Sequence, residues 1–203
     1  MSANGQGGAR RWAVAGAVLA VIVALAAGGV VGVGLWHRRG DAPVIAGERL
    51  KSFPEVDRGG LDETQGRILD VLAAEFDAQH PGTKYSEGVD EPWCADFVSW
   101  VMREAGRPLA NPNSGSWRIP GVYTLEDYYR GERRFEAATY RPKTGDVVMY
   151  SETSAFQQHT NIVIAADAAT GTITTVGGNE FGQVTIHRYN PGLISGLVGY
   201  GRL

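Results

Sequence analysis

The stretch WCADFVSWVM, residues 93–102, combines the single cysteine of this 203-residue chain with an apolar pattern of helical period. Its regularly spaced apolar residues are Phe97, Val98, Val101 and Met102. Because these positions share one face of a helix and Gly106 follows as a stop signal, we predict a helix from Cys94 to Ala105. The cysteine would then lie in the first turn.

The segments on either side of this helix predict a mixed domain over residues 62–203. Upstream, Asp62 can cap a helix that runs to about Gln79. Residues 109–144 are rich in loop signals, with room for a short helix around Leu125–Tyr129. The period then changes to short β-leaning runs at 146–150, 160–165, 172–176, 184–189 and 197–201. Helices followed by strands are typical of an α+β fold with an antiparallel sheet.

The N-terminal segment is predicted to be a membrane anchor. Residues 12–36 contain no charged side chain over 25 positions, which is long enough for a helix to cross the hydrocarbon core. We expect residues 1–11 to be a short cytoplasmic N-terminus, 12–36 a single transmembrane helix and 37–61 a linker. The alternative is a cleaved signal peptide with Ala24-Leu25-Ala26 as its cleavage site. Either interpretation places residues 62–203 outside the cytoplasm.

Composition limits the class of protein further. Hydrophobic residues make up 43% and charged residues 20%, as in globular domains. One cysteine excludes a disulfide scaffold and a cysteine-rich metal module. Residues 41–203 carry 22 acidic against 15 basic side chains, a net charge of −7, which argues against nucleic acid as a partner. No histidine and acid cluster has the spacing of a zinc site, and we predict neither metal nor cofactor.

Cys94 is a candidate nucleophile. A lone cysteine in an exported protein forms an intermolecular disulfide, is buried and inert, or is reactive. The first turn of a helix favours the reactive state, because its unpaired N–H groups and dipole stabilise a thiolate. The alternative is a small buried apolar residue packed beside Trp93 and Phe97.

A thiolate nucleophile needs a base and a group that orients the base. Of the four histidines, His37 flanks the apolar segment and His80 lies in a helix-stop turn, where both are expected in solvent. His187 lies in an alternating strand on the face opposite Ile186 and is expected to be exposed. His159 opens the apolar run HTNIVI, where a strand can hold it rigidly, and is the predicted base.

Four blocks of the sequence, taken in order, resemble the CHAP family, the cysteine/histidine-dependent amidohydrolases and peptidases of bacterial cell walls. Residues 91–101, EPWCADFVSWV, resemble its cysteine block, and 142–148, PKTGDVV, its Pro-x-x-Gly-Asp strand. Residues 159–163, HTNIV, resemble its histidine strand, and 176–179, VGGN, its Gly-Asn block. The family is related to the NlpC-type peptidases. The resemblance implies a papain-like α+β core, with N-terminal helices packed on an antiparallel sheet.

By the same resemblance, Cys94 is the nucleophile, His159 the general base and acid, and Asn179 the group that orients the imidazole. One position departs from the family, because many members carry Glu two residues before this Asn and the present chain has Gly177. Either Asn179 suffices or an acid such as Glu180 supplies the charge. In a regular strand Glu180 points to the face opposite Asn179, so we expect Asn179 to orient the base.

The resemblance also implies a function. We expect a single-pass, cell-surface hydrolase that cleaves amide bonds of peptidoglycan through a thioester, as an N-acetylmuramoyl-L-alanine amidase or a peptide endopeptidase. Its catalytic domain would face the cell wall from outside the membrane, or be secreted if the N-terminal segment is cleaved. A protein activator is one candidate partner. The alternatives are a catalytically silent wall-binding or divisome-type protein of the same fold, and an amidase acting on a small soluble amide.

Overall fold

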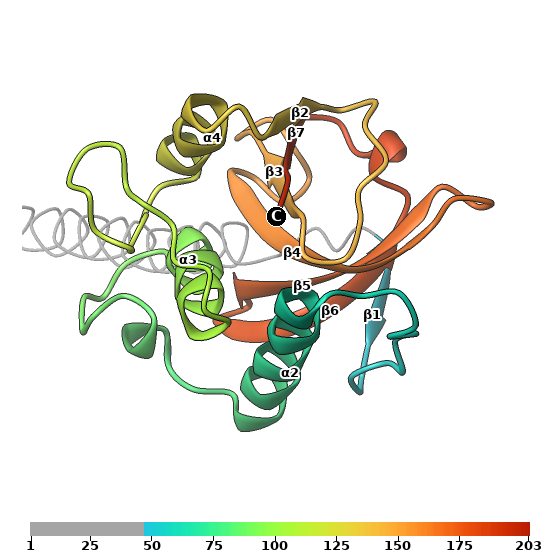
Figure 1. Ribbon diagram of the computed structural model, residues 1–203, viewed down its shortest axis with the longest axis horizontal. Helices are drawn as coiled ribbons and strands as arrows, with labels where there is room; N and C mark the ends of the chain where they lie inside the picture. The colour runs from blue at the N-terminus through green and yellow to red at the C-terminus, as the bar shows by residue number, and fades with distance from the viewer. Residues whose placement is uncertain (1–46) are drawn as a thin grey trace, which may run out of the picture. The chain divides into compact units, whose positions relative to one another are not determined.

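A seven-stranded antiparallel sheet and three α-helices make up residues 47–203, the part of the chain that the computed structural model describes (Figure 1). The helices are α2 (Glu63–Ala78), α3 (Cys94–Glu104) and α4 (Val122–Gly131). The strands are β1 (Glu48–Leu50), β2 (Phe135–Ala137), β3 (Val147–Tyr150), β4 (His159–Asp167), β5 (Thr172–Glu180), β6 (Gln183–Tyr189) and β7 (Leu197–Gly201). Their order across the sheet is β1-β6-β5-β4-β3-β7-β2, and every neighbouring pair is antiparallel. The predicted α+β class with an antiparallel sheet is confirmed.

The helix α2 begins at its predicted cap. Asp62 accepts a hydrogen bond from the backbone N–H of Gln65 (2.8 Å), and the Gln65 side chain accepts one from the Asp62 N–H (2.9 Å). This capping box satisfies two donors that the first turn leaves unpaired. At the other end, Gln79 adopts a left-handed backbone and closes the helix. The predicted helix from Asp62 to about Gln79 is confirmed.

The helix α3 packs on β4 and β5, with α2 and α4 beside it. Nine of its eleven residues are buried, which makes it the central helix of the core. The sheet comes close to α3 at Gly178. A Cβ atom there would lie 2.5 Å from Trp93 Cζ3 and 2.6 Å from Phe97 Cβ. A side chain at position 178 would therefore separate β5 from the helix that carries Cys94.

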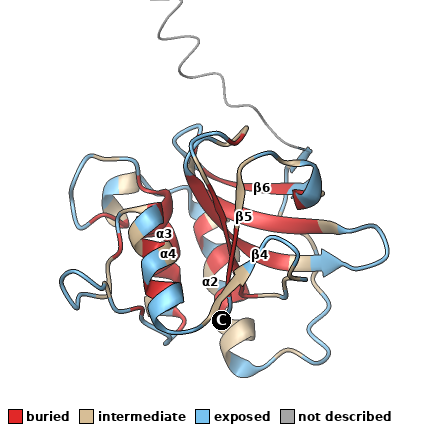
Figure 2. Ribbon diagram, turned by 90° about the horizontal axis from the view of Figure 1, so that it is seen from above, coloured by how far each residue is buried: buried red, intermediate tan, exposed pale blue. Residues whose placement is uncertain are grey.

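The centre of the sheet is buried on both faces, as the red segments of β4, β5 and β6 show in Figure 2. One face packs on the helices. The other is covered by a second cluster made of Val148, Tyr150, Val163, Ile173, Tyr189 and Tyr200. Phe156, from the loop between β3 and β4, packs on Tyr150 and Tyr189. Polar side chains on this second face therefore lie inside the protein.

The prediction of a linker over residues 37–61 is wrong for part of that range. Residues 48–50 form β1, an edge strand that pairs with Ile186 to Arg188 of β6. Gly47 permits the close approach, because it has a φ of +78° and a Cβ there would lie 2.2 Å from the Arg188 carbonyl oxygen. The domain therefore starts before Asp62, since backbone pairing extends the sheet into a sequence with no apolar period.

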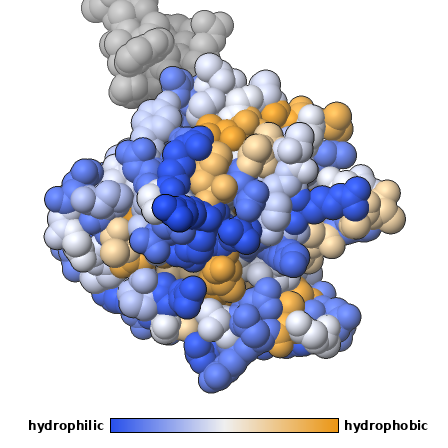
Figure 3. All heavy atoms as spheres, turned by 45° about the horizontal axis from the view of Figure 1, so that its top comes forward, coloured by the Kyte–Doolittle hydropathy of each residue, from blue (hydrophilic) through white to orange (hydrophobic). Residues whose placement is uncertain are grey.

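Three further predictions depend on the N-terminal part of the chain. The short N-terminus 1–11, the anchor 12–36 and the start of the linker lie outside the described residues. Within residues 47–203, no helix has the length and apolar character needed to cross a bilayer. The large exposed apolar side chains of this part are Val89, Tyr123, Phe181 and Leu193. On the face drawn in Figure 3, apolar patches are interspersed with polar side chains.

Candidate active site

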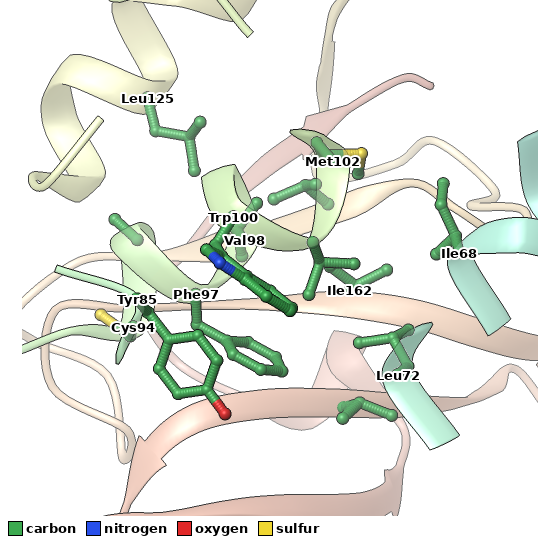
Figure 4. Close-up of a cluster of buried hydrophobic side chains, with 14 of the residues drawn as sticks. Ile68, Leu72, Tyr85, Cys94, Phe97, Val98, Trp100, Met102, Leu125 and Ile162 are labelled. Atoms are coloured by element: carbon green, nitrogen blue, oxygen red, sulfur yellow. The ribbon is translucent and has the colours of Figure 1, made fainter. Parts of the chain in front are cut away.

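Cys94 is the first residue of α3, where helical backbone begins after Trp93. Its side chain lies at the edge of the apolar cluster in Figure 4 and is 6% exposed. The first N–H groups of a helix have no carbonyl acceptor within the helix. The thiol is therefore placed beside backbone donors that can bind a developing negative charge.

An aromatic stack supports this end of the helix. Tyr85 stacks on Trp93 with ring centroids 5.0 Å apart and meets Phe97 edge-on at 5.0 Å. The Tyr85 hydroxyl donates to Glu75 Oε2 (2.8 Å), and Lys84 pairs with the same carboxylate. Because Glu75 belongs to α2, these contacts fix the start of α3 against its neighbouring helix.

A buried ion pair lies in the first turn of α3. Asp96 is fully buried, and Arg118 Nε lies 2.7 Å from its Oδ1. The same guanidinium contacts Glu91, on the other side of Cys94 in the sequence. Burial, together with the negative charge of Glu87, raises the pKa of Asp96 to about 7. Arg118 thus contacts carboxylates on both sides of the cysteine in the sequence.

His159 is the first residue of β4 and is brought to Cys94 by the packing of that strand on α3. Its imidazole hydrogen-bonds with Cys94 and, through Nε2, with Glu180 Oε1 at 2.9 Å. Since Nε2 faces Glu180, Nδ1 is the nitrogen left for the thiol. Burial lowers the pKa of His159, but the contacts with Cys94 and Glu180 outweigh burial and raise it to about 10.

Glu180 reaches the imidazole because β5 contains a bulge. The register shifts between Gly177, which pairs with Thr185, and Glu180, which pairs with Gln183. Asn179 takes a left-handed backbone there, with a φ of 61°. One extra residue reverses the alternation, so Glu180 returns to the face of Gly177. A Cβ at Gly177 would lie 2.6 Å from Glu180 Oε1, so the carboxylate occupies the space that a side chain at position 177 would fill.

Two sequence-based expectations need correction. The expectation that Glu180 points away from the site is wrong, because it assumed a regular strand. Asn179 is half-buried at the bulge, and the side chain that holds His159 Nε2 is that of Glu180. The expectation that His187 is exposed is also wrong. Its side chain is buried (2% exposed), because the second cluster covers its face of the sheet.

The buried Glu180 carboxylate keeps its charge despite desolvation. Burial raises its pKa, but the hydrogen bond and charge of His159, together with His187 and Thr185, lower it below the usual value. Within residues 47–203, no group of three or more His, Cys, Asp or Glu side chains is arranged to hold a metal ion. The site therefore joins a thiol, an imidazole and a carboxylate at the boundary between helix and sheet.

Comparison with known proteins identifies one family. The family model of the CHAP domain matches residues 85–179, a span that includes Cys94, His159 and Asn179 and ends one residue before Glu180. No curated protein and no solved structure matches the chain. The acid in contact with the imidazole thus lies immediately outside the matched region.

Proposed function

Because the family model of the CHAP domain matches residues 85–179, we propose that this protein is a cysteine hydrolase that cleaves amide bonds of peptidoglycan. The family consists generally of cysteine/histidine-dependent amidohydrolases, and its domain indicates a function of the peptidoglycan-hydrolase type. The observation that carries the proposal is the double contact of His159, with Cys94 on one side and Glu180 on the other. That arrangement can activate a thiol.

In the first step, His159 takes the thiol proton of Cys94 and becomes an imidazolium. The Nε2–H of this ring donates to Glu180, whose negative charge stabilises the imidazolium. A thiolate beside the first turn of α3 is favoured in addition by the helix dipole. In this proposal Glu180, rather than Asn179, is the orienting residue.

The thiolate of Cys94 then attacks an amide carbon. The carbonyl oxygen becomes an oxyanion that the N-terminal N–H groups of α3 can bind. As the C–N bond breaks, the imidazolium of His159 gives its proton to the departing amine, and a thioester to Cys94 remains. Water, deprotonated by the neutral imidazole, attacks the thioester, so the products are a carboxylic acid, the amine and the free thiol.

The finer assignments belong to the same proposal. We infer that the substrate is a stem or cross-bridge peptide of peptidoglycan, cut as an N-acetylmuramoyl-L-alanine amidase or an endopeptidase would cut it. Residues 12–36 would anchor the protein in the cell membrane as a single helix, with the catalytic domain facing the wall. This location follows from the uncharged segment of the sequence and is compatible with a protein activator.

The test is digestion of peptidoglycan by the full chain, with Cys94→Ala as the inactive variant and mass spectrometry of the released fragments. Cleavage by the wild type alone is the expected result, and the new end groups name the bond. Because Cys94 is the single cysteine, wild-type protein blocked with iodoacetamide is a matched control and should be equally inactive. If folded wild type and Cys94→Ala both leave the wall intact, the proposal fails and a silent wall-binding protein is favoured.

A further inference from the structure

A second histidine lies on the far side of the carboxylate. His187 Nε2 is 3.2 Å from Glu180 Oε2, while His159 Nε2 is 2.9 Å from Oε1. The two imidazoles come from β6 and β4, the strands on either side of β5. Glu180 therefore bridges two buried rings with its two oxygens.

The bulge in β5 explains why His187 and Thr185 meet the carboxylate. Thr185 and His187 are two residues apart on β6 and so share a face. Thr185 pairs with Gly177, over which the carboxylate lies, and its hydroxyl donates to Glu180 Oε2. Oε2 is thus held from β6, and Oε1 is left for the catalytic imidazole.

A buried carboxylate requires partners for both oxygens. An unpaired charge in the interior is costly, and a carboxylate held by one oxygen alone can rotate about its last bond. The hydrogen bond from Thr185 and the charged contact with His187, both on Oε2, fix the rotation of the carboxylate and direct Oε1 at His159 Nε2. The contact of His187 with Glu180 Oε2 is protected from solvent, because His187 is 2% exposed and bulk water does not compete for its imidazole.

We propose that His187 is a positioning residue that holds Glu180 against His159 and thereby maintains the thiolate of Cys94. The inference rests on the proposed function for its catalytic meaning, but it concerns the state of the free enzyme. In this proposal His187 acts on the thiol through Glu180.

Other titratable and charged groups lie near Glu180, and their titration must be distinguished from that of the site in a pH-dependent measurement. Burial raises the pKa values of Tyr150 of β3 and Tyr189 of β6, and the charge of Glu180 raises them further. From β1, Arg49 pairs in register with His187, and its guanidinium donates to Gln183. The phenols of Tyr150 and Tyr189 stay neutral at mildly acidic pH. A measurement below neutrality therefore reports on the two histidines, Glu180 and the thiol.

The experiment measures the rate at which iodoacetamide alkylates Cys94 in the full chain, from about pH 5 to pH 9, since the thiolate is the reacting form. His187→Leu removes the polar contact, and His187→Gln replaces Nε2 by an amide N–H that can donate to Oε2. We expect His187→Leu to react about tenfold more slowly at about pH 5–6, the effect of losing one charged contact with Glu180. His187→Gln should stay within about twofold of the wild type.

Controls keep the outcome specific. His80→Leu changes an exposed histidine outside the site and should leave the profile unchanged, and thermal unfolding checks that each variant is folded. The inference is overturned if folded His187→Leu keeps the wild-type profile, or if His187→Gln is as slow as His187→Leu. Because alkylation needs no peptidoglycan, a wild type that fails to cleave walls but shows this pattern would contradict the proposed substrate and support the role of His187.

Discussion

The two sides of the site are held in different ways. Cys94 stands at the start of a regular helix, whereas Glu180 follows a bulge in β5. A nucleophile of this kind needs the unpaired N–H groups that only a helix start presents in a row, so its position is fixed by regular hydrogen bonding. The acid needs only to place one oxygen at the imidazole. The acid can therefore be carried by different positions of the strand, provided that its side chain still reaches the imidazole.

The position of the acid illustrates that freedom. Many CHAP members carry Glu at the position of Gly177, and here the Glu180 carboxylate fills the space beside that glycine. The bulge and the missing side chain are complementary. One brings the carboxylate back to the face of residue 177, and the other leaves room for it.

The largest effect should separate Glu180 from Asn179. We expect Glu180→Gln to lower kcat by about a hundredfold or more, because the amide removes the charge that stabilises the imidazolium. Asn179→Gly, which keeps a residue suited to the left-handed backbone at the bulge, should lower kcat by less than about threefold. The measurement is release of peptidoglycan fragments at saturating substrate. A larger loss for Asn179→Gly than for Glu180→Gln would return the orienting role to Asn179.

The neighbouring glycines of β5 offer a matched pair for the next test. Gly177→Ala places a Cβ about where Asn161 Oδ1 and Glu180 Oε1 now lie, at 2.1 and 2.6 Å. We expect it to displace the carboxylate and lower kcat by about tenfold, the factor for one weakened charge-assisted contact. Gly178→Ala instead meets Trp93 and Phe97, and should lower the free energy of unfolding by about 2 kcal/mol through overpacking.

Denaturant unfolding and initial rates measured on both variants decide the matter. If Gly177→Ala loses stability without loss of kcat per folded molecule, the carboxylate is not the group that this glycine accommodates. If Gly178→Ala leaves stability unchanged, β5 does not depend on close approach to α3. The first result would contradict the role of Gly177 in making room for the Glu180 carboxylate. The second would contradict the role of Gly178 in packing β5 on α3.

Regular elements were predictable from the sequence because their signals are local. The apolar period of residues 97–102 and the Asp62 cap require only neighbours in the chain, and both helices appear as predicted. The α+β class follows from the same patterns. The edge strand β1 was missed because its pairing with β6 depends on a partner more than a hundred residues away.

The acid side could not be predicted in the same way. Alternation places Glu180 correctly only if the register across β5 and β6 is known, and a bulge changes that register. The signal available was the run Gly177-Gly178-Asn179, because glycine and asparagine tolerate the left-handed backbone that a bulge uses. The burial of His187 depends on the Tyr150 and Tyr189 cluster, which no local pattern reveals.

The protonation of His159 links the two sides of the site and makes the stability of the protein depend on pH. Its pKa is about 10 in the folded protein and about 6.5 in an unfolded chain. Between these values the folded state binds one more proton at this ring. The contribution of His159 to stability is therefore complete below about pH 6.5 and is lost as pH rises through about 10. We expect the difference in unfolding free energy between wild type and His159→Gln to shrink over that range.

The pH dependence of unfolding, measured again in Cys94→Ala and in Glu180→Gln, shows how much each contact contributes to the raised pKa of His159. The hydrogen bond with Cys94 raises the pKa of His159 most among its favourable contacts, and that with Glu180 follows. Cys94→Ala should therefore flatten the pH dependence at least as much as Glu180→Gln does, with denaturant unfolding as the measurement and His159→Gln as the reference in each background. A slope that survives both substitutions would mean that neither contact holds the proton. In that case the helix and the bulge would position the ring without setting its charge.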